Sequence, residues 1–214
     1  MTMTEPQRLR FTFAKHGPMR FTGHLDLHHA CERTLRRANA PVAHSAGFSP
    51  RPRLSLGLAL PLGFTSDCEL IDVWLAEPRQ PAQLLPALQL SAPPGLRVLA
   101  ALAVDAKEPA LQKQIVAASY EAHLQQASSL ADLHRRIRLL LDSPEILRQW
   151  RGKSYDLRPL IETLEARPTD DGGVLLLMRL SAVEGATGRP EEVLQSLDLD
   201  PHGAHIHRVQ IHLK

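Results

Sequence analysis

The feature that most limits how this chain can fold is the order of its hydrophobic patterns, which repeats once along the 214 residues. Segments with period-two alternation, typical of strands, and segments with helical spacing follow one another as strand, helix, strand, strand, helix, strand. This is the order of a ferredoxin-like unit, in which a four-stranded antiparallel sheet carries both helices on one face. The sequence therefore predicts an α+β protein of two tandem ferredoxin-like (βαββαβ) domains.

The position of each domain follows from a change in composition near the middle of the chain. Residues 106–114, AKEPALQKQ, are polar and contain a proline, which is typical of a linker. We predict an N-terminal domain at residues 1–105 and a C-terminal domain at 115–214, each large enough to bury a core. Residues 143–156 fit no element of the repeated unit, and we expect them to decorate the second domain.

The predicted elements can be given by residue number. In the first half we expect strands at 8–14, 54–60, 68–77 and 96–105, and helices at 24–38 and 80–89, with Thr22 as the N-cap of the first helix. In the second half we expect strands at 115–124, 158–168, 173–183 and 204–213, and helices at 130–142 and 189–197.

Composition also limits the class of protein. Hydrophobic residues make up 43% and charged residues 22% of the chain, as in soluble globular proteins. The sequence contains no run of 18 apolar residues, and its first residues pass directly into a strand pattern, so we predict a cytoplasmic protein with no membrane partner. Cys31 and Cys68 form no CxxC motif, and we expect buried, reduced thiols.

Positive charge is concentrated at the start of the chain. Residues 1–53 hold nine lysines and arginines against three acids, whereas the whole chain has a net charge of only +2. Within this region lies the loop AGFSPRPR, where Gly47 permits a tight turn and prolines stiffen the backbone around Arg51 and Arg53. Phe48 in this loop is available either to the core or to a stacking nucleobase.

These residues predict a surface that binds phosphate groups or nucleic acid, because planar guanidinium groups bind phosphate oxygens bidentately. Two alternatives remain: the loop arginines pair with local acids, and the charges at the end of the first helix simply complement its dipole. The predicted phosphate-binding residues are Lys15, Arg20, Arg36, Arg37, Phe48, Arg51 and Arg53.

The first helix offers a second kind of site. His24 and His28 are four residues apart and Cys31 follows, so metal-ligand types share one face. No further ligand motif lies nearby, and Cys31 also fits the apolar stripe, so we predict a pocket of His24, Asp26 and His28 and no bound metal. Asp26 also suits the positive end of the helix dipole. Nucleophilic triads, paired catalytic carboxylates and nucleotide loops are absent as patterns, so we assign no catalytic residue and no cofactor.

Several short motifs in the first half occur in a fixed order. They are K-x-G-x-x-R-F from Lys15, H-L-D-L at the start of the first helix, E-R-x-L-R-R-A, G-F-x-P-R-P-x-L-S-x-G and A-L-P-L-G. Over residues 8–77 this order resembles the radical-SAM-linked protein family. That family is a domain of unknown function, found as a separate chain or joined to the C-terminal end of radical SAM proteins.

The resemblance implies an accessory role. The cysteine triplet that binds the iron-sulfur cluster of radical SAM enzymes is missing, so the chain would be a non-radical accessory or substrate-binding protein. Tandem ferredoxin-like folds also resemble RNA-processing endoribonucleases and pseudouridine synthases, although the catalytic aspartate of the synthases is not found. Two hypotheses remain open. In the first the chain binds tRNA or another structured RNA; in the second it is a small-molecule or metal-binding pocket protein, or a partner domain of a radical SAM enzyme.

Overall fold

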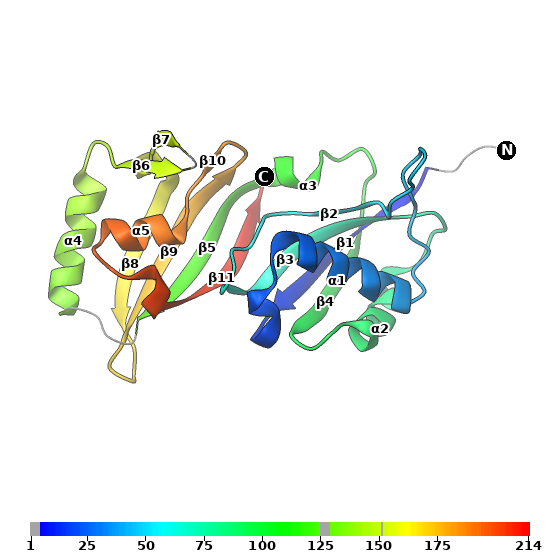
Figure 1. The fold of residues 1–214 in the computed structure, drawn as a ribbon, viewed down its shortest axis with the longest axis horizontal. Helices are drawn as coiled ribbons and strands as arrows, with labels where there is room; N and C mark the ends of the chain where they lie inside the picture. The colour runs from blue at the N-terminus through cyan, green and yellow to red at the C-terminus, as the bar shows by residue number, and fades with distance from the viewer. Residues whose placement is uncertain (1–4, 125–128, 151) are drawn as a thin grey trace. The chain divides into compact units, whose positions relative to one another are not determined.

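The computed structural model of the chain describes residues 5–124, 129–150 and 152–214. Contacts within the chain divide it into two compact units, Met1–Gln114 and Ile115–Lys214. Both are mixed α+β, with mostly antiparallel strand pairing and a few helices (Figure 1). In the described part of the chain, no helix is long and apolar enough to span a membrane.

The first unit contains four main strands in the order β2-β3-β1-β4, and each neighbouring pair is antiparallel. Helices α1 and α2 lie on one face of this sheet (Figure 1). The elements are β1 (Gln7–Lys15), a 3-10 turn η1 (Gly17–Phe21), α1 (His24–Arg37), β2 (Leu54–Leu56), β3 (Thr65–Leu75), α2 (Pro81–Ser91), β4 (Leu96–Val104) and α3 (Leu111–Gln114).

Strand β1 shows why these residues form a two-layer structure. Leu9, Phe11 and Phe13 alternate along the strand and are buried in the core that α1 and α2 cover. Burial of these side chains stabilises the unit by roughly 25 cal/mol for each Å² of apolar surface that is removed from water. Arg8 and Arg10 alternate with these residues and point to the opposite face of the sheet, because successive side chains of a strand alternate.

On that opposite face two arginines share one buried carboxylate. Arg8 Nε and Arg10 Nε donate to Asp72 of β3 at 2.8 and 2.7 Å, and the side chain of Asp72 is fully buried. Arg8 also donates to the carbonyl oxygens of Glu108 and Pro109. The segment 106–114, predicted to be a linker, therefore packs on the first unit and ends in α3.

Between α1 and β2 the chain forms an irregular hairpin at residues 42–53. His44 and Pro52 form an antiparallel bridge, and Ser45 and Arg51 are joined by a backbone hydrogen bond of 2.8 Å. Val42 in turn bridges to Leu75, the last residue of β3. The 42–53 hairpin is thus held at its base to the sheet, and its tip at residues 46–50 is exposed.

In the second unit the main strands lie in the order β8-β9-β5-β11, again with antiparallel neighbours. Helix α4 packs against β8, and the short strands β6 and β7 pair with each other in antiparallel fashion. The elements are β5 (Ile115–Leu124), α4 (Leu130–Asp142), β6 (Leu147–Trp150), β7 (Lys153–Asp156), η2 (Arg158–Leu160), β8 (Ile161–Pro168), β9 (Val174–Val183), β10 (Ala186–Thr187), α5 (Pro190–Ser196), η3 (Pro201–Gly203) and β11 (Ala204–Leu213).

Two local predictions in the first unit need correction. Gly23, and not Thr22, is the N-cap of α1, because the Thr22 hydroxyl donates to the Met19 carbonyl and closes η1 instead. The second strand was predicted over residues 54–60, but β2 ends at Leu56. Beyond it, Gly57 N donates to Leu70 O and the chain leaves the edge of the sheet, so the alternating leucines that follow are not part of a strand.

Candidate functional site

The first unit has an open groove of about 680 Å³ between α1 and the 42–53 hairpin. The helix forms one wall, the turn after it forms the floor, and the base of the hairpin forms the other wall. Its lining residues are His29, Glu32, Arg33, Leu35, Arg36, Asn39, Ala40, Pro41, Val42, His44 and Pro52.

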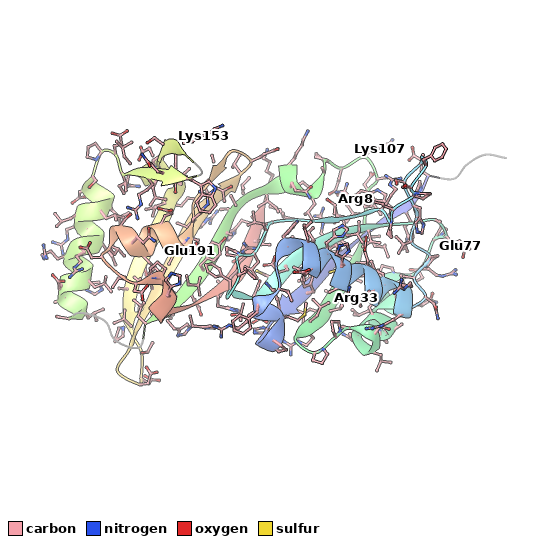
Figure 2. All side chains as sticks on the ribbon, viewed as in Figure 1. Arg8, Arg33, Glu77, Lys107, Lys153 and Glu191 are labelled. Carbon is pink, nitrogen blue, oxygen red and sulfur yellow. The ribbon has the colours of Figure 1, made fainter. Side chains whose placement is uncertain are left out.

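Helix α1 presents four polar side chains to this groove. Glu32 and Arg33 lie three and four residues after His29, and Arg36 lies four and three residues after them, which places all four along one face of the helix. The neighbouring face carries the buried residues and packs on the sheet. The amphipathic pattern that anchors α1 in the core therefore also orients Arg33 and Arg36 towards the groove (Arg33 is labelled in Figure 2).

The groove is positively charged. Arg33 and Arg36 are exposed, and neither forms an ion pair with any acid that the structure describes. Glu32 is the acid in the lining, and its carboxylate contacts histidines, with Oε2 3.1 Å from His29 Nδ1 and Oε1 3.5 Å from His28 Nδ1. The guanidinium groups of Arg33 and Arg36 are thus available to an anionic ligand.

The opposite wall ends in an aromatic side chain. His44 and Pro52 face the groove from the two arms of the 42–53 hairpin. Phe48 at the tip of the same hairpin has a relative exposure of 110%. The sequence left open whether this ring belongs to the core or is available for stacking, and its full exposure removes the first possibility.

Arg51 and Arg53 lie on the other side of the hairpin from the groove. They alternate with Pro52, so their side chains point away from the wall that Pro52 forms. The Arg53 guanidinium carbon lies 5.1 Å from the centroid of the Trp74 ring, on the face of the sheet that also holds Arg8. The structure therefore does not place these two arginines on one face with Arg36.

Three further predicted phosphate-binding residues also lie outside the groove. The prediction that Lys15 is part of this surface has to be corrected. Its side chain is fully buried and its ammonium group donates to the Thr22 carbonyl at 3.0 Å, so it cannot be part of an exposed surface. Arg20 precedes the first residue of α1, and its guanidinium group stacks on the ring of Phe21. The 14-residue helix is about 20 Å long, so Arg20 is far from Arg36 in the last turn. Arg37 is exposed on the last turn but does not line the groove.

The residues of the predicted pocket, His24, Asp26 and His28, do not line the groove either. His24 and Asp26 are exposed on the first turn of α1, and His28 is partly buried one turn later. Burial lowers the pKa of His28, although Glu32 opposes this shift. Cys31 is buried in the core, where loss of hydration raises the pKa of its thiol to about 12. Its thiol therefore stays protonated and is unsuited to metal binding or nucleophilic chemistry.

A family model described as "Uncharacterized protein conserved in bacteria (DUF2344)" matches residues 8–190 of this chain. The chain belongs to this family. The match includes both the groove in the first unit and most of the second unit. No curated protein matches the chain.

Two solved structures are similar to this DUF2344 chain. One is a Cbf5-Nop10-Gar1 complex, at 11% identity and a TM-score of 0.49, and the other an archaeal box H/ACA sRNP Nop10-Cbf5 complex, at 12% and 0.43. Each match covers 94% of this chain, which spans about half the length of the matched chains, 49% and 48%. At these TM-scores the similarity carries no functional argument.

Sequence reasoning found Arg36 but missed the other polar residues that line the groove in this DUF2344 protein: His29, Glu32, Arg33, Asn39 and His44. For His29, Glu32 and Arg33 a signal was present, because they precede Arg36 by seven, four and three residues, the spacing of one helical face. His44 could not be found in this way, since only the fold of the hairpin brings it opposite the helix.

Proposed function

We propose that this protein binds RNA, with a single-stranded segment of a tRNA or another structured RNA lying in the groove between α1 and the 42–53 hairpin. One observation carries the proposal: Arg33 and Arg36 face a groove of about 680 Å³ and form no ion pair with an acid in the described part of the chain. Guanidinium groups in this situation are suited to phosphate oxygens, which they bind with two parallel hydrogen bonds.

The exposed ring of Phe48 supports RNA over an isolated anion. Proteins that bind single strands combine a positively charged groove with aromatic side chains on which bases stack. Phe48 lies at the tip of the hairpin whose base forms one wall of the groove. Four other arginines lie outside the groove, and RNA binding in the groove does not require them: Arg20, Arg37, Arg51 and Arg53. Their predicted contributions to RNA binding remain predictions.

A filter-binding assay with total cellular tRNA and with an unstructured single strand at low salt tests this proposal. The double variant Arg33→Ala/Arg36→Ala is expected to lose most of the retention, and Phe48→Ala to weaken it at unchanged net charge. Arg138→Ala removes an exposed arginine of α4 in the second unit and is the charge control, expected to bind like the parent. Absence of retention by the parent, or equal binding by the double variant, would contradict the proposal.

We further propose that each unit is a ferredoxin-like domain. The strand orders β2-β3-β1-β4 and β8-β9-β5-β11, each with two helices between strands, support this assignment. An experimental structure tests it through the pairing of the central strands β1 and β5.

An accessory role beside a radical SAM protein is the second part of the proposal, and it rests on the motif order in residues 8–77. Affinity purification of the full chain from its own cells tests it by whether a radical SAM protein is recovered. The alternative of a small-molecule pocket is favoured by the groove volume, which lies within the range of about 300–1,000 Å³ of ligand sites. A salt-insensitive thermal shift with mononucleotides, without binding of RNA, would support that alternative.

A further inference from the structure

We propose that His28, His29 and Glu32 form a binding site for one divalent transition-metal ion on the outer surface of α1. Each of the three side chains offers one ligand atom, and these atoms all lie within 4.8 Å of one another. In the part of the chain that the structure describes, no other trio of histidine, cysteine and acidic side chains meets this condition. Two imidazoles and one carboxylate are ligands that Zn²⁺ and related ions prefer.

The helix explains how the three ligand groups meet. His28 and His29 are adjacent and diverge around the helix, and Glu32 lies four and three residues further on, between them. Its two carboxylate oxygens reach one histidine each, at 3.5 Å to His28 Nδ1 and 3.1 Å to His29 Nδ1. The two imidazole rings are perpendicular, with centroids 6.0 Å apart. A small movement of these side chains brings all three ligand atoms around one ion.

A competing explanation is that Glu32 only forms ion pairs with the two histidines. The geometry favours a metal site, because the ligand atoms of all three side chains lie within 4.8 Å of one another, so one ion can contact all three. The site is also partly accessible, with side-chain exposures of 31% for His28, 60% for His29 and 25% for Glu32. An ion can therefore enter from solvent and keep open coordination positions.

The position of the site relates it to the groove. His29 and Glu32 both belong to the groove lining, beside Arg33. An ion held there would add positive charge next to the guanidinium groups and offer a coordination position to an oxygen ligand in the groove. This inference goes beyond the proposed function, and it does not depend on it, because metal binding is measured without RNA.

Isothermal titration of the untagged full-length protein with Zn²⁺, and separately with Mg²⁺, tests the proposal. The parent is expected to bind one Zn²⁺ at this site and no Mg²⁺, since Mg²⁺ prefers oxygen ligands. Glu32→Gln keeps the shape of the side chain but removes the anionic ligand. We expect Glu32→Gln and His28→Ala to weaken Zn²⁺ binding by at least about tenfold, because even the loss of an outer partner of a metal ligand costs about 10- to 100-fold.

His24→Ala is the matched control, because His24 is an exposed histidine one turn earlier on the same helix and outside the trio. It is expected to bind Zn²⁺ like the parent. Weakening by His24→Ala with none by Glu32→Gln would assign the ion to the His24–His28 pair and overturn the proposal, as would absence of Zn²⁺ binding by the parent. Circular dichroism of each variant shows that the fold is retained. If Zn²⁺ binds and RNA does not, the proposed function fails while this inference stands.

Discussion

Cys31 illustrates at the scale of single residues how position decides chemistry. Its spacing from His24 and His28 is that of a metal ligand, yet its side chain lies in the core of the first unit. The ligand trio instead lies on a partly exposed side of the same helix. A sequence gives the residue types on a helix, but which of two overlapping faces is buried depends on what packs against it.

This burial predicts the reactivity of the two thiols. The Cys31 thiol, with a pKa raised to about 12, should resist iodoacetamide at pH 8 in the native protein, whereas the partly exposed Cys68 should react. Mass spectrometry of peptides after timed labelling measures both, and labelling in denaturant provides the control in which both react. Native labelling of Cys31 as fast as that of Cys68 would show that its burial is wrong.

At the scale of elements, helix α2 contains an interruption that the fold tolerates. Pro86 lies inside the helix and is exposed, and it offers no N–H to the carbonyl of Ala82. Pro86→Ala restores this hydrogen bond and is expected to stabilise the protein by up to about 3 kcal/mol, measured by urea unfolding. Pro81→Ala is the control, because proline is favourable at the first helical position and little change is expected. A loss of stability in Pro86→Ala would contradict this account of α2.

The elements themselves were largely predictable from the sequence. The period-two patterns matched β1, β3 and β5 within a few residues, and the helical spacing matched α1 and α4. The predictions were wrong where the same local pattern also fits a different structure. Thr22 is a residue type that favours the N-cap of a helix, but here it closes the C-terminal end of η1. The alternating leucines after β2 resemble a strand, but they leave the sheet. The hairpin wall of the groove was not predictable, because the bridge between His44 and Pro52 depends on the packing of the whole unit.

At the scale of the whole molecule, the buried cluster of Arg8, Arg10 and Asp72 joins segments far apart in the sequence. Asp72 accepts hydrogen bonds from both arginines, and Arg8 also binds the carbonyls of residues 108 and 109. Asp72→Asn leaves two buried guanidinium groups without a counter-charge. We expect a loss of about 3–5 kcal/mol in the free energy of unfolding, measured with urea.

The exposed pair of Arg79 and Glu77 provides the matched control for this cluster. Glu77→Gln should change the stability by less than about 1 kcal/mol, because solvent screens surface ion pairs. Equal, small effects of Glu77→Gln and Asp72→Asn would show that the buried cluster does not hold the first unit together.

The central claim is that the groove arginines bind RNA phosphates. The salt dependence of tRNA affinity tests it most directly, because each neutralised phosphate of a single strand contributes about 0.7 to the slope of log K against log salt concentration. We predict that Arg33→Ala/Arg36→Ala lowers this slope by about 1.4 relative to the parent, while Arg138→Ala leaves it unchanged. An identical slope for the parent and the double variant would contradict the account.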